Sequence, residues 1–196
     1  MTETSILPVD PIALAQQWFK AAVEQEVREP GVLALATVSA EGRPSTRVVQ
    51  TIRITDRGLV FASYTTSPKG RDIAETGWAS GVLYWRETRQ QVILTGRVEQ
   101  LSAAESDELW YARPPGTHPM SVATAQSEPL EDEDELRARV RRLGASGEPL
   151  PRPDTWVGYH LEPSTVEFWE DGPDRLYWRM RSQRDGAGWT SVRLQP

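Results

Sequence analysis

Short apolar or alternating runs recur along most of the chain, and this pattern predicts β-strands. Val32–Val38 is a continuous apolar run of strand length that follows the break at Pro30-Gly31. Apolar and polar residues alternate in Gln91–Leu101, which predicts a strand with one face on a core. Further predicted strands are Thr46–Ile54, Leu59–Ser63, Trp78–Trp85 and a group within Trp156–Leu194 that is broken at Glu162-Pro163, Asp171–Pro173 and Asp185–Gly188.

A few segments show helical patterns instead. Asp10 and Pro11 favour a helix that runs to about Val27, with Asp10 as its N-cap and Trp18 and Phe19 on its packing face. Acidic residues early and arginines late predict a helix over Glu131–Leu143. Other signals are a short helical segment, Arg71–Glu75, and a capping-box pattern at Ser102–Glu105 that begins a helix ending near Pro114 and followed by a loop with Thr117, His118 and Pro119.

These elements predict one mainly β domain with short helices. Many short strands with few helices are typical of a small β-barrel with helical excursions. At 196 residues the chain is long enough to bury one sizeable core. We expect residues 1–29 to form an N-terminal extension with a packing helix, and residues 30–196 to form the barrel domain.

Composition and charge exclude several classes of function. The net charge of −6 disfavours generic binding to nucleic acid or to anionic membranes. Because the chain has no cysteine, disulfides and thiolate zinc sites are excluded. The two histidines, His118 and His160, lack the spacing of a metal site, so we expect no metal. No basic leader or apolar run of about 18 residues occurs, so we expect a cytoplasmic protein.

The remaining polar signals suggest a site for phosphate. No sequence signal of a serine hydrolase, a P-loop enzyme or a Rossmann fold is present. Arg47 lies in a predicted strand, Lys69 is one of only two lysines, and Gln126-Ser127 follows a helix-like stretch. A buried phosphate needs about two cations with hydroxyl or amide donors to offset its desolvation. These residues together could form such a pocket.

A second group of residues could surround a flat ring system. Gln91, the run Val166–Trp169 and the segment Arg175–Arg179 supply an amide, aromatic side chains and arginines. A ring with polar edges requires aromatic packing, amide donors and a cation near its electron-rich end. Taken singly, each of these residues also fits an ordinary core or surface role. Residue chemistry alone therefore supports an anion pocket and nothing more specific.

A set of spaced motifs resembles the pyridoxamine 5′-phosphate oxidase family. The motifs are Arg47–Val49, Ser67–Gly70, Arg89–Val92, Ala112–Pro114, Gln126-Ser127, Val166–Trp169 and Arg175-Leu176, in the family's order and at family-like spacing. They span residues 30 to 196. Within that family, further segments resemble the oxidases of phenazine biosynthesis: Arg28–Pro30, Gly42–Arg47, Trp78–Glu87, Thr117–Ser121 and Leu150–Pro153.

The resemblance implies a split β-barrel homodimer that binds flavin mononucleotide (FMN) at the subunit interface, with both subunits building each site. The residues implied around the ribityl phosphate are Arg47, Ala62, Ser63, Ser67, Lys69, Gln126 and Ser127. Those implied at the flavin ring are Gln91, Trp169 and Arg179, with Val48, Val49, Gln50 and Thr51 passing along its edge through backbone groups. The implied substrate-side residues are Arg113, Thr117, His118, Arg175 and Tyr177, with His118 as a proton shuttle.

Several positions depart from the vitamin-forming members of the family. Ile52 replaces a lysine that contacts substrate, and Leu109 replaces a phosphate-contacting tyrosine. Tyr177 stands where the family motif has histidine, and Pro68 replaces a frequent arginine, which leaves Lys69 more of the phosphate charge to balance. Each charge-assisted hydrogen bond contributes about 1.5–3 kcal/mol. The losses at Ile52 and Leu109 should therefore weaken binding of a phosphorylated substrate.

The leading hypothesis is an FMN-dependent oxidase that oxidises reduced phenazine carboxylates, with dioxygen as the final acceptor and hydrogen peroxide as a product. Two alternatives remain open. One is oxidation of pyridoxamine or pyridoxine 5′-phosphate by the same chemistry. The other is a flavin-binding module without catalysis.

Overall fold

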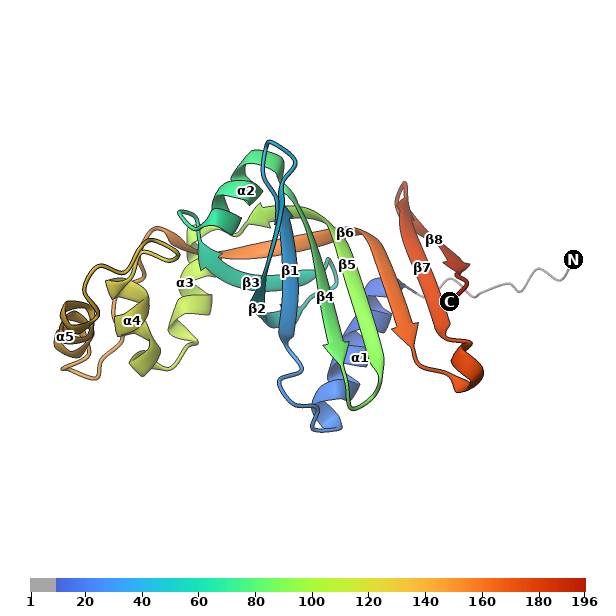
Figure 1. Cartoon of the computed structure of the whole chain (residues 1–196), viewed down its shortest axis with the longest axis horizontal. Helices are drawn as coiled ribbons and strands as arrows, with labels where there is room; N and C mark the ends of the chain where they lie inside the picture. The colour runs from blue at the N-terminus through green and yellow to red at the C-terminus, as the bar shows by residue number, and fades with distance from the viewer. Residues whose placement is uncertain (1–9) are drawn as a thin grey trace, which may run out of the picture.

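An antiparallel β-sheet that closes on itself dominates the structure, a computed structural model that describes residues 10–196. The strands follow the order β3-β2-β1-β4-β5-β6-β7-β8, and β3 also pairs with β6, so that the strands from β3 to β6 form a barrel (Figure 1). This arrangement confirms the predicted mainly β barrel. The strands are β1 (Val32–Val38), β2 (Pro44–Ile54), β3 (Leu59–Tyr64), β4 (Trp78–Trp85), β5 (Gln90–Gln100), β6 (Trp156–Glu170), β7 (Trp178–Asp185) and β8 (Gly188–Arg193).

The barrel interior holds the main hydrophobic core. Along β1, every second residue is buried, and β5 shows the same alternation over most of its length. Leu35, Phe61, Leu94 and Phe168 are fully buried and belong to one cluster. Burying each such side chain contributes about 1.5–3 kcal/mol. The alternation found in the sequence thus sets which face of each strand points inward.

The long strand β6 connects the barrel to the β7–β8 ribbon. Its first part pairs with β3, its last part pairs with β7, and β5 runs along nearly all of it. The predicted break at Glu162-Pro163 is wrong, because the strand continues through a register shift opposite Thr95 and Gly96. A proline fits there because a bulge leaves one backbone position without a ladder hydrogen bond.

Helix α1 (Pro11–Glu24) packs on the barrel. The Asp10 carboxylate accepts a hydrogen bond from the Ile12 amide at 2.8 Å, which confirms the predicted cap. Trp18 lies edge-on to Phe168 of β6, with ring centroids 5.1 Å apart. The helix ends before the predicted Val27, because Glu26 adopts a left-handed backbone conformation (φ 55°).

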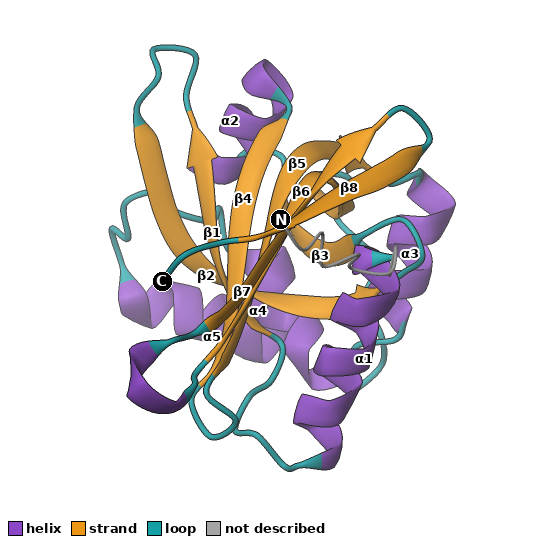
Figure 2. Cartoon of the chain, turned by 90° about the vertical axis from the view of Figure 1, so that its right-hand side faces the viewer, coloured by secondary structure: helices purple, strands orange, loops and turns teal. Residues whose placement is uncertain are grey.

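In chain order, helix α2 follows strand β3, and helices α3, α4 and α5 lie in the connection from β5 to β6. Helix α2 (Pro68–Thr76) begins at Pro68, earlier than predicted, and contacts β1 and β4 (Figure 2). The capping box at Ser102 is confirmed, although its helix α3 (Ala103–Tyr111) ends before Pro114. The predicted loop around His118 is wrong: it forms a 3-10 turn, Pro115–Thr117, followed by helix α4 (His118–Ala123).

Helix α5 (Glu133–Leu143) packs beside α4, away from the barrel (Figure 1). Its N-cap is Asp132, so the helix begins two residues later than predicted. None of the helices formed by residues 10–196 is both long and apolar enough to cross a lipid bilayer.

Candidate functional site

The structure brings four of the predicted phosphate residues together around Lys69. The ammonium Nζ donates to Gln126 Oε1 at 2.7 Å and lies 3.4 Å from Ser67 Oγ. Ser63 Oγ donates to the same Gln126 oxygen at 3.3 Å. Lys69 is only 6% exposed, and no carboxylate pairs with it within residues 10–196. We call this group, together with Arg47, the cation cluster.

The positive charges of Lys69 and Arg47 repel each other. Burial, and then the nearby Arg47 charge, lowers the pKa of Lys69 to about 8. Burial also lowers the pKa of Arg47, although Asp72 opposes this effect. A desolvated cation pair of this kind is stabilised by a bound anion, because the anion supplies the missing opposite charge.

The Arg47 guanidinium is fixed by strands β1 and β2. Its Nη1 donates to the Leu35 carbonyl at 3.2 Å and to Thr37 Oγ1 at 2.7 Å, and its Nη2 donates to Ser45 Oγ at 2.5 Å. Thr37 and Ser45 face each other across the two strands. Sequence analysis did not select these two hydroxyl residues, although Ser45 lies two positions before Arg47 and thus on the same strand face.

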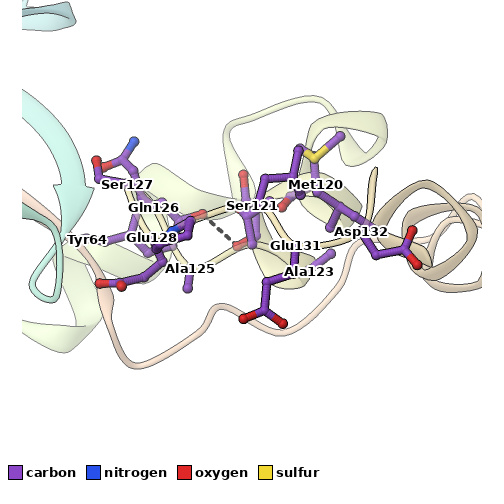
Figure 3. Close-up of a pocket in the computed structure, with 14 residues that line it drawn as sticks. Tyr64, Met120, Ser121, Ala123, Ala125, Gln126, Ser127, Glu128, Glu131 and Asp132 are labelled. Atoms are coloured by element: carbon purple, nitrogen blue, oxygen red, sulfur yellow. Dashed lines mark hydrogen bonds between the residues drawn. The ribbon is translucent and has the colours of Figure 1, made fainter. Parts of the chain in front are cut away.

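A pocket of about 630 Å³ adjoins the cation cluster on the side of α4 (Figure 3). Gln126 and Ser127 line it, and Ser127 has a left-handed backbone (φ 72°). Its ionisable residues are Tyr64, Glu128, Glu131 and Asp132, so its charge is negative. This acidic lining disfavours a carboxylate ligand, and the pocket is therefore a poor substrate site for an anionic compound.

The predicted flavin-ring residues form a second cluster, on β5, β6 and β7. Gln91 is the register partner of Trp169, which in turn is the partner of Arg179. Trp169 also packs against Tyr177, with ring centroids 5.0 Å apart. We call Gln91, Trp169, Tyr177 and Arg179 the aromatic cluster. Within residues 10–196, no hydrogen bond or ion pair links it to the cation cluster.

A buried carboxylate lies beside the aromatic cluster and was not predicted. Glu167, only 8% exposed, accepts a hydrogen bond from Arg179 at 2.6 Å and two from Arg181 at 2.9 and 3.0 Å. Burial alone would raise the pKa of Glu167, but the two arginines hold it below its ordinary value. The position of Arg179 is therefore set both by its place in β7 and by its ion pair with Glu167.

Arg113 has a donor that the protein leaves unused. Its guanidinium lies over the rings of Trp110 and Trp156, at 4.8 and 5.2 Å, and Nη2 donates to Ser121 Oγ at 2.9 Å. Nη1 is buried and has no hydrogen-bond partner within residues 10–196. An unsatisfied buried donor on a cation is costly, so this nitrogen is suited to receive an anionic ligand atom.

His118 does not fit the predicted proton shuttle. The ring is fully buried, and Nδ1 accepts the Leu150 amide hydrogen bond at 3.2 Å. With Nδ1 an acceptor, Nε2 carries the proton and donates to the Trp110 carbonyl at 3.2 Å. The ring also packs on Trp110. Both nitrogens are therefore occupied, and the residue joins α3, α4 and the segment before β6.

The other predicted site residues are scattered in the single chain. Arg175 is exposed and lies with Asp174 in a turn where both have positive φ, 60° and 58°. Such conformations cost about 1–3 kcal/mol each and often accompany function. Thr117 uses its hydroxyl on the Pro114 carbonyl. On β2 and β3, Val48 and Gln50 are exposed, Val49 and Ala62 are half-buried, and Thr51 is buried with its hydroxyl unpaired within residues 10–196.

Comparison with known families shows to which family the chain belongs. A model described as pyridoxamine 5′-phosphate oxidase matches residues 19–147, and one described as the C-terminal dimerisation region of pyridoxine 5′-phosphate oxidase matches residues 156–196. The chain belongs to the pyridoxamine 5′-phosphate oxidase family. The family predicted from the motifs is confirmed.

Individual members of the family resemble the chain over nearly its whole length. A dihydrophenazinedicarboxylate synthase of Burkholderia lata is 48% identical over 189 residues, covering 96% of this chain and 89% of the relative. A pyridoxine/pyridoxamine 5′-phosphate oxidase of Thermosynechococcus vestitus is 42% identical over 188 residues, covering 95% of this chain and 89% of the relative.

Solved structures give the same picture. The crystal structure of PhzG from Burkholderia lata, in complex with tetrahydrophenazine-1-carboxylic acid, superposes with a TM-score of 0.95 at 47% identity. The match covers 100% of this chain and 97% of that one. The two Burkholderia lata matches agree with the phenazine branch predicted from the sequence.

Proposed function

We propose that the protein is an FMN-dependent oxidase of reduced phenazine carboxylates that works as a homodimer. The observation that carries this proposal is the cation cluster, in which Lys69 and Arg47 are both desolvated and no carboxylate of residues 10–196 pairs with Lys69. A phosphate monoester would supply the missing charge. The family membership points to FMN as its source.

The residues of the cation cluster fit an FMN phosphate. Lys69 and Arg47 would provide charge-assisted hydrogen bonds, and Ser63 and Gln126 would add neutral donors. The Ser67 hydroxyl instead donates to the Tyr64 carbonyl and caps α2, so it holds the start of the helix that carries Lys69. The Thr51 hydroxyl, buried and unpaired within residues 10–196, is available along the expected flavin edge. Gln126 can keep Oε1 as the acceptor for Lys69 and donate from Nε2 to the phosphate.

The second chain of a dimer would complete the site. Within residues 10–196, no hydrogen bond or ion pair joins the aromatic cluster to the cation cluster. Three of its four residues, Trp169, Tyr177 and Arg179, lie in the region that matches the dimerisation model. Trp169 would pack on the flavin ring and Arg179 would stabilise negative charge on the reduced ring. A two-fold interface would bring each aromatic cluster to the partner's cation cluster.

The chemistry that FMN would supply when bound is the two-electron oxidation of the substrate, with dioxygen as the final acceptor and hydrogen peroxide as the product. The protein's part is to bind and orient the substrate. Arg113 would offer its unpaired Nη1 to a substrate carboxylate, and Arg175 would project from its turn toward the same ligand. Aromatisation of the substrate supplies much of the driving force, so no strong protein base is required.

The substrate class follows from the relatives and from the departures in the chain. The Burkholderia lata structure holds a reduced phenazine carboxylate, and that protein is 47% identical to this one. Leu109 has no hydroxyl to offer a substrate phosphate, and it is buried in an apolar cluster. Ile52 is 42% exposed and supplies no cation. A carboxylated, largely apolar substrate fits these positions better than a phosphorylated one.

Anaerobic mixing tests the proposal. Protein loaded with FMN should lose its yellow colour when a reduced phenazine dicarboxylate is added, and faster than with pyridoxamine 5′-phosphate. Arg113→Ala should slow this bleaching while retaining flavin, whereas Lys69→Ala should lose flavin from a folded protein. Faster bleaching by pyridoxamine 5′-phosphate would favour the vitamin-forming reaction, and bound flavin that neither compound bleaches would favour a non-catalytic module.

A further inference from the structure

A partly buried carboxylate lies beside Arg47. Asp72 lies in α2, one turn after Lys69, and its side chain is 13% exposed. Its Oδ2 accepts hydrogen bonds from Thr37 Oγ1 at 2.6 Å and from Ser45 Oγ at 3.2 Å. The same oxygen lies 4.0 Å from Arg47 Nη2, which is beyond direct hydrogen-bond distance. Asp72 therefore reaches Arg47 through two hydroxyl groups.

The directions of these hydrogen bonds are fixed by chemistry. An ionised carboxylate only accepts and a guanidinium only donates, while each hydroxyl has one proton to donate. Thr37 and Ser45 therefore accept from Arg47 and give their protons to Asp72, which is a nearer and charged acceptor for Ser45 than the Thr37 oxygen at 3.4 Å. Hydrogen bonds linked in this way polarise and strengthen one another. The two hydroxyls form a two-pronged bridge from the carboxylate to the guanidinium.

The bridge joins the two cations of the cluster through one helix. Lys69 and Asp72 are both on α2, and Arg47 is on β2, so Asp72 fixes the position of the strand cation relative to the helix cation. The Leu35 carbonyl also holds Arg47, but it is a neutral acceptor. The charge of Asp72 opposes the repulsion between Arg47 and Lys69 and so helps to keep the guanidinium in place.

We propose that Asp72 is a positioning residue, which orients Arg47 through Thr37 and Ser45 to receive the phosphate of the cofactor. This inference rests on the proposed function. Its effect is specific to phosphate, because the bridge contacts nothing expected at the flavin ring. Asp72 also carries a negative charge, which by itself repels phosphate, so orientation and charge make opposite predictions.

The affinity of the apoprotein for FMN and for riboflavin separates these effects. Flavin fluorescence quenching measures both dissociation constants, and riboflavin serves as the ligand without phosphate. Asp72→Ala should weaken FMN binding by about tenfold or more, and leave riboflavin binding unchanged. Asp72→Asn retains an acceptor and should restore part of the loss. Glu75→Ala, which removes an exposed acid from the same helix, should change neither constant.

A second variant keeps the inference testable if Asp72→Ala does not fold. Thr37→Val with Ser45→Ala removes both prongs of the bridge but keeps the carboxylate, and should again weaken FMN binding alone. Tighter FMN binding in Asp72→Ala would overturn the inference, as would equal losses for both flavins. A wild-type protein that does not prefer FMN over riboflavin would instead contradict the proposed function.

Discussion

Lys69 combines burial with a neighbouring positive charge, and both conditions favour its neutral form in the free protein. Its pKa near 8 lies below the ordinary value of 10.5 found in an unfolded chain. Between these two values the unfolded chain binds a proton that the folded chain does not. The free energy of unfolding of the apoprotein therefore rises with pH over this range.

This linkage gives a testable pH dependence. From about pH 8 to 10.5, Lys69 should make the apoprotein more stable, by up to about 3 kcal/mol. Lys69→Met should abolish that increase, and bound FMN should also reduce it, because a phosphate stabilises the charged lysine. Urea unfolding at several pH values measures the effect.

The other lysine provides the control. Lys20 is exposed and pairs with Glu24 on α1, so Lys20→Met should leave the pH dependence as in the wild type. An identical slope in Lys69→Met and wild-type protein would show that Lys69 keeps an ordinary pKa.

At this scale, sequence analysis identified the cations but not what orients them. Lys69 was a candidate because lysine is rare in the chain, and Arg47 because a charge interrupts an apolar strand. Asp72 gave no such signal, since an acid in a short helix is usually solvated. Its role depends on contacts with Thr37 and Ser45, far away in the sequence, which only the folded barrel brings together.

Among the elements, strands β5 and β6 depend on a glycine at their irregular pairing. A Cβ on Gly96 would lie 2.0 Å from the Glu162 carbonyl oxygen and 2.6 Å from Pro163 Cα. Both neighbours are backbone atoms, so a side chain could enter only by separating the strands.

Gly96→Ala should therefore destabilise the fold by at least about 2–3 kcal/mol, as overpacking does in well-packed interiors. Gly116 is the matched control, because a Cβ there meets no atom within 4 Å and its φ is not positive. Chemical denaturation of both variants gives the comparison. A stability of Gly96→Ala close to that of Gly116→Ala would mean that the bulge can absorb a methyl group.

Strand positions were predicted well because alternation and apolar runs are local signals. Val32–Val38 and Trp78–Trp85 have the predicted bounds. The failures lie where tertiary contacts override local ones: Pro163 sits in a strand because the bulge tolerates it, and Thr117–Pro119 is helical because His118 is held by Trp110 and Leu150.

Across the whole molecule, the two halves of the proposed site lie in separate parts of one chain. A dimer that combines them can be tested by mixing defective chains. Lys69→Met damages the cation cluster, and Trp169→Ala damages the aromatic cluster, so each homodimer should bind flavin poorly. After unfolding and refolding the two variants together in equal amounts, about a quarter of the sites should combine two intact clusters and recover FMN binding.

The control mixes two variants of the same cluster. Lys69→Met refolded with Arg47→Ala should recover nothing, because every site then lacks one of the two cations. No recovery in either mixture would mean that each site is built by one chain alone. A sequence cannot predict this arrangement from patterns, since the contacts between copies leave no period in the chain; here it came from the family resemblance.

The course of β6 determines how the molecule comes apart. The two family models divide the chain near residue 156, yet β6 pairs with β3 at one end, with β7 at the other and with β5 along its length. Separation of the β7–β8 ribbon would remove the hydrogen-bond partner of the last part of β6, the strand that closes the barrel by pairing with β3. The regions that match the two family models should therefore not melt separately. Heating should unfold both in a single cooperative transition.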